Sequence, residues 1–312
     1  MSHKTGNLIM AGILVNKLYD FKGHRDSVYA LTGSKDDNYF FSSGGDGLIA
    51  GWDMNHPDQG NLLAKVPNSV YALHYLADKN LLAVGHNQDG LHLIDIDEKK
   101  EVASVNLTSN SIFDIQSFDN FLVIASGDGT ITLVDRNNLS VPKKIKASNK
   151  SARTIALNRR LNELAVGFSD NFIRIYSLPD FSLKKEWLAH TNSVFSLHYT
   201  LDNVFLISAS RVARLKKWSA LQGYQLEEEV PAHLYAINGM AFSPDGKHFI
   251  TCSMDKTIKL WDTENMKLLK VIDRARHGGH STSVNKVLWL SDNRLVSGSD
   301  DRNISIWNIH FE

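Results

Sequence analysis

Apolar and polar residues alternate in short runs along the chain. In TIKLW, residues 257–261, Ile258 and Leu260 fall on one side of an extended chain and the residues beside them fall on the other. This period of two is typical of a half-buried β-strand. A second apolar run, HFITCS, precedes it at residues 248–253, and an earlier one ends in SPDG at residues 243–246, which has the composition of a tight turn. Helical periods are absent, so we expect a fold built from strands.

The strand pattern recurs with a period of about 42 residues. The aligned third strands are residues 46–53, 88–95, 128–135, 170–177, 212–219, 255–262 and 301–308. They end near residues 52, 94, 134, 176, 218, 261 and 307, in steps of 42, 40, 42, 42, 43 and 46. Four strands per repeat of this length are the signature of a β-propeller. The sequence therefore predicts an all-β fold, a single domain over residues 1–312 with seven four-stranded antiparallel blades.

In these repeats the chain resembles the WD40-repeat family. The pairs that carry the resemblance are Trp52-Asp53, Trp261-Asp262, Gly23-His24 and Gly279-His280, with Ala189-His190 and Ala232-His233 as near copies. The resemblance covers about residues 13–312 and implies a seven-bladed propeller.

Ring closure can be predicted from the two ends of the repeat array. The chain stops soon after Trp307, so the last blade lacks an outer strand, while residues 13–21 precede the first Gly-His and belong to no blade. We expect this segment to complete the last blade, which hides two sheet edges. The apolar run at residues 8–15 is too short for a membrane span of roughly 20 residues. No small-residue cleavage site follows it, so we expect a strand rather than a signal peptide.

The resemblance also implies one hydrogen-bonded set in each blade: a His before the first strand, a Ser or Thr on the second, an Asp in the turn and a Trp on the third. A buried indole, hydroxyl and imidazole each need a partner. Blades 1, 6 and 7 have complete sets. These are His24, Ser42, Asp46 and Trp52; His233, Thr251, Asp255 and Trp261; and His280, Ser297, Asp301 and Trp307.

Blades 2 to 4 lose the His, hydroxyl and Trp of this set together. Those positions hold Val66, Val84 and Ile94 in blade 2; Thr108, Ile124 and Val134 in blade 3; and Ser148, Val166 and Tyr176 in blade 4. Removing all partners is nearly neutral, whereas removing one leaves the others unsatisfied. We expect Thr108 and Ser148 to bond backbone or water, and Asp128 and Asp170 to act as turn formers.

Blade 5 contradicts this rule. It keeps His190, Ser208 and Trp218, but Val212 stands where the complete sets have Asp. Two interpretations are open. Either a water or Arg211 compensates, or Val212 replaces a former Asp, by nature or by engineering.

In the family, the top face forms around the start of each first strand. The residues there are Tyr29, Tyr71, Phe113, Arg153, Phe195, Asn238 and Asn285, with Arg211 just before the turn of blade 5. Two residues earlier stand Ser27, Ser69, Ser111, Ser151, Ser193, Ala236 and Ser283. Aromatic residues and Arg are enriched at binding hot spots, so we expect a protein or peptide to bind here, with Arg153 as an anion contact. The alternative is that the rings only pack the channel wall.

Composition limits the other function classes. Lys plus Arg and Asp plus Glu are both 34, and Cys252 is the one cysteine, so no intrachain disulfide can form and we expect a cytoplasmic protein. The sequence has no nucleophile elbow, zinc-protease motif or phosphate loop. The four His of the blade sets lie tens of residues apart, so we expect no metal and no cofactor. We also expect a monomer that does not bind membranes.

Two further functions remain open. Residues 141–217 hold 14 Lys and Arg against 5 Asp and Glu, which suggests a basic side on blades 4 and 5. Such a side would suit nucleic acid or an acidic partner. The third possibility is a propeller enzyme with a small substrate in the channel, although no inward pair of carboxylates is available for acid–base chemistry. The leading hypothesis is a non-catalytic interaction scaffold.

Overall fold

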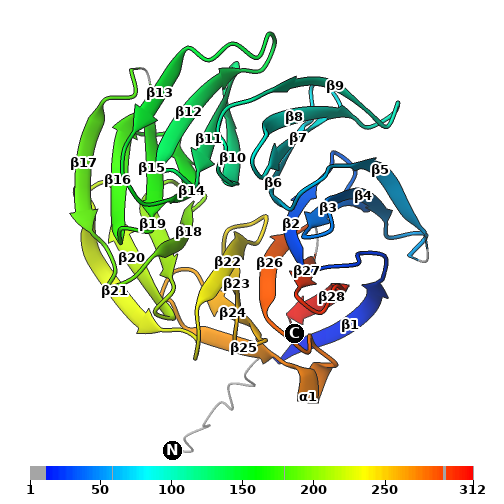
Figure 1. Cartoon of the computed structure of the whole chain (residues 1–312). Helices are drawn as coiled ribbons and strands as arrows, with labels where there is room; N and C mark the ends of the chain where they lie inside the picture. Colours follow the sequence, from blue (N-terminus) through cyan, green and yellow to red (C-terminus); the bar gives the residue numbers. More distant parts are fainter. Residues whose placement is uncertain (1–11, 58, 179, 291–292, 312) are drawn as a thin grey trace, which may run out of the picture.

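Seven blades stand in a ring around a central channel (Figure 1). The structure is a computed structural model and describes residues 12–57, 59–178, 180–290 and 293–311. Each blade is a four-stranded antiparallel sheet whose first strand lines the channel. The predicted all-β, seven-bladed architecture is confirmed.

The first four blades follow the chain in order. Blade 1 contains β2 (Val28–Gly33), β3 (Tyr39–Gly44), β4 (Leu48–Asp53) and β5 (Gly60–Lys65). Blade 2 contains β6 (Val70–Leu76), β7 (Leu81–His86), β8 (Gly90–Asp95) and β9 (Lys100–Val105). Blade 3 contains β10 (Ile112–Phe118), β11 (Phe121–Ser126), β12 (Thr130–Asp135) and β13 (Lys143–Lys146). Blade 4 contains β14 (Ala152–Asn158), β15 (Glu163–Phe168), β16 (Phe172–Ser177) and β17 (Leu183–Leu188).

The last three blades complete the ring. Blade 5 contains β18 (Val194–Tyr199), β19 (Phe205–Ser210), β20 (Arg214–Ser219) and β21 (Gln225–Pro231). Blade 6 contains β22 (Ile237–Phe242), β23 (His248–Ser253), β24 (Ile258–Asp262) and β25 (Leu268–Ile272). Blade 7 contains β26 (Val284–Trp289), β27 (Arg294–Ser299) and β28 (Ile304–Phe311), and its outer strand is β1 (Ile13–Phe21).

The two ends of the chain close the ring together. β1 pairs antiparallel with β28, from Ile13 opposite Phe311 to Phe21 opposite Ile304. Asp20 accepts a hydrogen bond of 2.6 Å from Ser305, and Lys17 lies over the ring of Trp307. The predicted closure is confirmed. Of the apolar run at residues 8–15, Ile13 and the two residues after it lie in β1, and residues 8–11 fall outside the described residues.

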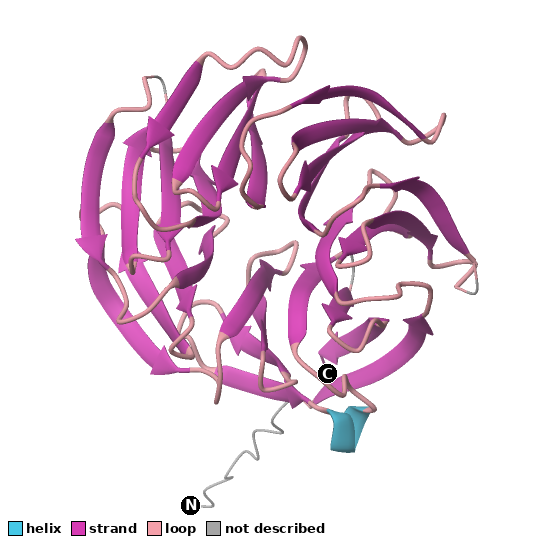
Figure 2. Cartoon of the chain, in the orientation of Figure 1, coloured by secondary structure: helices cyan, strands magenta, loops and turns pink. Residues whose placement is uncertain are grey.

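One short helix interrupts the all-strand pattern (Figure 2). α1 (Arg274–His277) is capped by Asp273, whose side chain accepts from the Arg276 N–H, and ends at Gly278 with a φ of 66°. Sequence periodicity did not predict it because four residues are too few for a helical period. It lies within the last and longest repeat step. No helix within the described ranges is long and apolar enough to cross a membrane.

Blades pack face to face through apolar side chains, and glycines allow the closest approaches. Val28 of β2 fits against Gly298 of the preceding blade, where an added Cβ would lie 2.6 Å from the Val28 side chain. Gly167 meets Val194 in the same way, at 2.7 Å. A larger residue at either glycine would force neighbouring blades apart, because protein cores have little free volume.

The three complete polar sets form as predicted. In blade 1 the Trp52 indole donates to Ser42 at 2.7 Å, Ser42 Oγ lies 2.7 Å from His24 Nε2, and His24 Nδ1 lies 3.0 Å from Asp46. Because the indole can only donate, the hydroxyl donates onward to Nε2 and leaves the imidazole proton on Nδ1, facing the carboxylate. Blades 6 and 7 repeat this chain of contacts through Asp255 and Asp301.

In blade 5 the hydrogen-bonded set lacks only its last member, the Asp. Trp218 donates to Ser208 at 2.9 Å, and Ser208 Oγ lies 2.7 Å from His190 Nε2. His190 Nδ1 is buried and has no hydrogen-bond partner within the described part of the chain. Arg211, one of the two groups suggested to compensate, is exposed and does not form a hydrogen bond with it. The imidazole proton on Nδ1 is therefore left without an acceptor among the described residues.

We expect the stability of the protein to fall as the pH drops below about 6.5. Burial, followed by the charge of Lys216, lowers the pKa of His190 to about 3. The unfolded chain binds this proton near pH 6.5 and the folded chain does not, so the contribution of His190 is present above pH 6.5 and lost toward pH 3. The loss approaches about 1.4 kcal/mol per pH unit for one such group.

Urea unfolding at pH 7.5, 6 and 5 measures this slope. Val212→Asp should flatten it, because a carboxylate at that position favours the charged imidazole, as Asp255 does for His233. Parallel curves for the wild type and the variant would show that His190 does not set the slope.

Blades 3 and 4 keep more polar contact than the sequence suggested. Thr108 accepts from the Asn110 N–H at 3.1 Å, as expected. Ser148 accepts from a backbone N–H but also donates to Asp170 at 2.6 Å. Asp170 forms its turn, accepting from the Phe172 N–H, and pairs with Arg174 at 2.9 Å. The prediction that Asp170 is only a turn former was therefore too narrow.

A buried polar chain joins blades 4 and 5. Tyr199 and Tyr224 share a hydrogen bond of 2.6 Å between their hydroxyls, and Tyr224 donates to Glu163. Lys184 pairs with the same carboxylate, and Tyr224 stacks on Trp187 with ring centroids 5.2 Å apart. These contacts link blade 4 to blade 5, the blade whose set lacks its carboxylate.

Candidate functional site

The predicted top-face residues share one structural property. In each blade the pairing of the innermost strand with its neighbour skips one residue, as between Val28 and Ala30. The skipped residues are Tyr29, Tyr71, Phe113, Arg153, Phe195, Asn238 and Asn285. A β-bulge redirects a side chain away from the regular alternation of a strand. These seven residues are called the channel mouth below.

A backbone contact repeats beside every bulge. In each blade, the residue before the turn Asp position donates its N–H to the carbonyl of the residue two positions before the bulge. In blade 1, the Gly45 N–H donates to the Ser27 carbonyl at 2.8 Å. The same bond occurs in all seven blades and ends with Asp300 to Ser283 at 3.0 Å. The loops around the channel mouth are thus fixed by backbone geometry, which leaves the side chains free to vary.

The seven mouth residues line a common cavity of about 480 Å³. All seven are half-buried. Deeper in the channel, Asp114, His198 and Lys286 also contribute to the wall. Arg211, the eighth predicted binding residue, is exposed in the turn between β19 and β20 and does not line this cavity.

The aromatic residues of the mouth contact one another in sequence around the ring. The ring centroids of Tyr29 and Tyr71 lie 4.7 Å apart, and those of Tyr71 and Phe113 lie 5.6 Å apart. The Arg153 guanidinium continues the series, 4.0 Å from the Phe113 centroid and 5.3 Å from that of Phe195. This arrangement holds five large side chains in place before any partner arrives.

Arg153 supplies the positive charge of the mouth. Its Nε donates to Ser169 at 3.0 Å, and no carboxylate of the described residues lies within 4.0 Å of it. Burial, more than the neighbouring charges, lowers its pKa, although a guanidinium stays charged at neutral pH. An arginine with aromatic neighbours and no acidic partner can accept a carboxylate or phosphate from outside.

The cavity does not offer a pair of acid–base groups. The Asp114 carboxylate already accepts from the Ile155 N–H at 2.7 Å and from Gln116 at 3.1 Å. Burial lowers the pKa of His198 to about 4, which keeps this imidazole neutral at pH 7. These positions favour binding over proton transfer.

The ring of serines serves the scaffold more than a ligand. Ser69 donates to the Gly45 carbonyl at 3.4 Å, and Ser151 donates to the Gly127 carbonyl at 3.0 Å. Each of these bonds joins one blade to the blade before it. These two hydroxyls therefore connect neighbouring blades.

The basic side predicted on blades 4 and 5 does not extend over blade 5. The acidic run at residues 227–229 lies in β21, the outer strand of blade 5, so that Val194–Pro231 holds four basic and four acidic residues. Glu229 pairs with Arg214 at 3.1 Å and with Lys216 at 3.4 Å. The charge count over residues 141–217 ended before this run, which strand pairing places in the same blade.

Two features escaped the sequence analysis. Leu234, Tyr235 and Met254 are 84%, 63% and 51% exposed and stand on loops at the mouth end of blade 6. The second feature is a cluster of three polar side chains in blade 2, made by His86, Asp89 and His92. Its signal in the sequence is the spacing HNQDGLH at residues 86–92, which lies outside the blade sets.

Comparisons with known proteins agree with this architecture. The family model described as WD domain, G-beta repeat, matches residues 15–53, 224–262 and 270–308. The crystal structure of the WD40 β-propeller domain of Doa1 superposes with a TM-score of 0.84 at 19% identity, covering 94% of this chain and 97% of that one.

Curated relatives are longer proteins. Actin-interacting protein 1 of Caenorhabditis elegans is 24% identical over 298 residues, which covers 93% of this chain and 48% of the relative. WD repeat-containing protein 1 of Gallus gallus is 24% identical over 299 residues, with the same coverage. This chain spans about half the length of the curated relatives it matches. Three repeats of the chain match the WD domain, G-beta repeat, family model, and the chain folds as a seven-bladed β-propeller.

Proposed function

We propose that the protein is a non-catalytic scaffold that binds a protein or peptide at the channel mouth. The observation that carries the proposal is the contiguous series of aromatic rings and Arg153 around the cavity, with no acidic partner for that arginine in the described residues. Large aromatic residues and Arg dominate the binding energy of protein interfaces. The partner we expect presents an acidic side chain to Arg153 and apolar groups to the rings.

The exposed apolar residues of blade 6 extend this surface. Leu234 and Tyr235 precede β22, and Met254 follows β23, so all three stand at the same end of the ring as the mouth. Clustered apolar exposure of this kind is typical of interaction surfaces. A partner bound at the channel mouth would also contact these three residues.

A triple change of Tyr71, Phe113 and Phe195 to Ala should abolish partner capture. Pull-down from a cell extract with mass spectrometry identifies what the wild type binds and what the variant loses. The matched control changes Leu14, Leu183 and Leu268 to Ala, since these exposed leucines lie on the outer strands β1, β17 and β25. If the mouth variant keeps its melting temperature and still captures the same proteins, the binding site lies elsewhere.

Actin is one partner to test by name, because a relative is called actin-interacting protein 1. Co-sedimentation with filaments, with the wild type and the mouth variant side by side, tests it directly. Absence of binding would leave the scaffold proposal standing and remove actin from it.

The remaining alternatives carry less support. Nucleic-acid binding has less support, because the acidic residues of β21 leave blade 5 without net charge and the excess of Lys and Arg lies in residues 141–193. A channel enzyme would need acid–base groups that the occupied Asp114 and neutral His198 do not provide. A cytoplasmic location and a monomeric state stay predictions, which fractionation and light scattering can test.

A further inference from the structure

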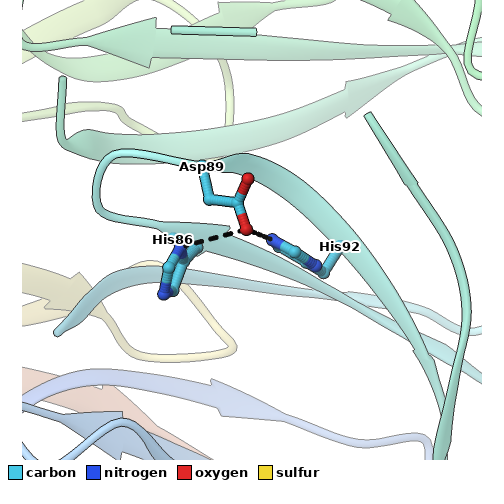
Figure 3. A group of neighbouring side chains, drawn as sticks. All are labelled: His86, Asp89 and His92. Atoms are coloured by element: carbon cyan, nitrogen blue, oxygen red, sulfur yellow. Dashed lines mark ion pairs between the residues drawn. The ribbon is translucent and has the colours of Figure 1, made fainter. Parts of the chain in front are cut away.

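Blade 2 places two histidines and an aspartate together at the tip of one hairpin (Figure 3). His86 ends β7 opposite Gly90, and His92 stands in β8 opposite Val84. Side chains two residues apart share a face of a strand, so His86 and His92 are diagonal neighbours on the same face of the hairpin. Gly90 has no side chain to separate them. Asp89, in the turn, completes the group from above.

The three side chains point their ligand atoms at one another. Asp89 Oδ2 lies 3.6 Å from His92 Nε2 and 4.0 Å from His86 Nδ1, and all three atoms lie within 4.8 Å of one another. Zinc binds His nitrogen and carboxylate oxygen at about 2.0–2.2 Å. A cation between these atoms therefore requires each to move inward by less than about 1 Å. Asp89 is 52% exposed, and its turn leaves it room to do so.

Both histidine nitrogens that face this space lack a hydrogen bond. His86 Nδ1 and His92 Nε2 are buried and have no hydrogen-bond partner among the described residues. Buried polar atoms of native proteins are nearly always satisfied, so two such atoms aimed at one carboxylate need an explanation. A bound cation would satisfy both at once.

A fourth side chain prepares His92 for this role. Glu101 of β9 lies 2.9 Å from His92 Nδ1. The carboxylate accepts a hydrogen bond from the Nδ1–H of His92, which leaves the lone pair on Nε2, directed toward Asp89 and His86. A carboxylate behind a histidine ligand is the usual outer support of a protein metal site.

His86 is the weaker ligand. Its Nε2 accepts from the Asn68 N–H at 3.2 Å, so the free imidazole carries its proton on Nδ1. Binding a cation through Nδ1 requires that proton to leave and the Asn68 contact to loosen. The site should therefore hold metal less tightly than a structural site with four preformed ligands.

We propose that His86, Asp89 and His92 form a zinc site on blade 2, with Glu101 as a positioning residue. Two imidazoles and a carboxylate suit Zn²⁺, and three protein ligands leave a fourth position open to solvent. The proposal is independent of partner binding at the channel mouth. It replaces the expectation of no metal, which considered only the histidines of the blade sets.

Zinc titration of the full-length, chelator-treated protein against a chromophoric chelator tests the site. The wild type should bind one equivalent of Zn²⁺, and Co²⁺ in its place should give the visible absorption of a four-coordinate ion. His92→Gln and Asp89→Asn should each weaken binding at least about tenfold, and Glu101→Gln by about 10–100-fold. Because Asp89 is exposed, Asp89→Asn tests the site without risk to the fold.

His56→Gln is the matched control. His56 lies 2.8 Å from Asp53 and forms an exposed His–Asp pair without a third ligand, so its loss should not change zinc binding. His3→Gln controls for binding by the amino-terminal segment. Melting curves establish that each variant is folded. Zinc binding that is absent in the wild type, or equally strong in folded His92→Gln and Asp89→Asn proteins, would overturn the proposal.

Discussion

Deletion of residues 1–20 should destabilise the whole ring rather than trim its end. The deletion removes every β1 residue paired with β28 except Phe21, and with them the bond from Ser305 to Asp20. At about 0.5–1.5 kcal/mol for each net hydrogen bond, the loss is on the order of 5 kcal/mol. For a chain of this size that lowers the melting temperature by roughly 10 °C or more. Calorimetry measures the shift.

The freed edge of β28 provides a second readout. An unpaired edge strand invites association, so the truncated protein should also aggregate in light scattering. A synthetic peptide of residues 12–21 should restore the melting temperature in trans, because β-strand addition reuses the same backbone bonds. A truncated protein that melts like the wild type would mean that blade 7 is stable with three strands.

Val212→Asp should raise the melting temperature. The turn from Ser210 to Ala213 matches the turn from Gly44 to Gly47, since both close with a bond between their end residues and place the last at positive φ. A carboxylate at position 212 would therefore reach His190 Nδ1, as Asp46 reaches His24 at 3.0 Å. Satisfying a buried donor is worth about 1–3 kcal/mol, or roughly 2–6 °C here.

A double-mutant cycle separates this bond from a general effect of the substitution. Val212→Asp made together with His190→Ala should give little or no gain, because the donor is gone. Val212→Asn controls for polarity without charge. A drop in melting temperature for Val212→Asp alone would show that the blade satisfies His190 in another way.

Among the described residues, blades 2 and 5 both contain buried histidine nitrogens that lack a hydrogen bond. Blade 2 has lost the set of His, hydroxyl and Trp, and His86 and His92 stand at the end of β7 and in β8 instead. Blade 5 retains the set but lacks its carboxylate. In both blades the buried imidazole nitrogens without partners mark where the repeat has departed from its pattern.

Sequence alone determined the fold and the members of the channel mouth. A period of about 42 residues repeats local information seven times, so strands, turns and sets such as His24 to Trp52 reinforce one another. The residues of the channel mouth could be predicted because each occupies the equivalent position near the start of the first strand of its blade. That they are bulge residues, and that Arg153 lies between Phe113 and Phe195, could not be known without the pairing register.

Tertiary structure decided the features that depend on pairing between strands. The acids of β21 neutralise blade 5 because they lie beside Arg214 and Lys216, which composition counted separately. The Glu163 and Tyr224 contact joins residues 61 positions apart. His86 and His92 meet because the hairpin places them diagonally across Gly90. A periodic sequence specifies the strand and its face, but the distance between two side chains is set only when neighbouring strands and blades come together.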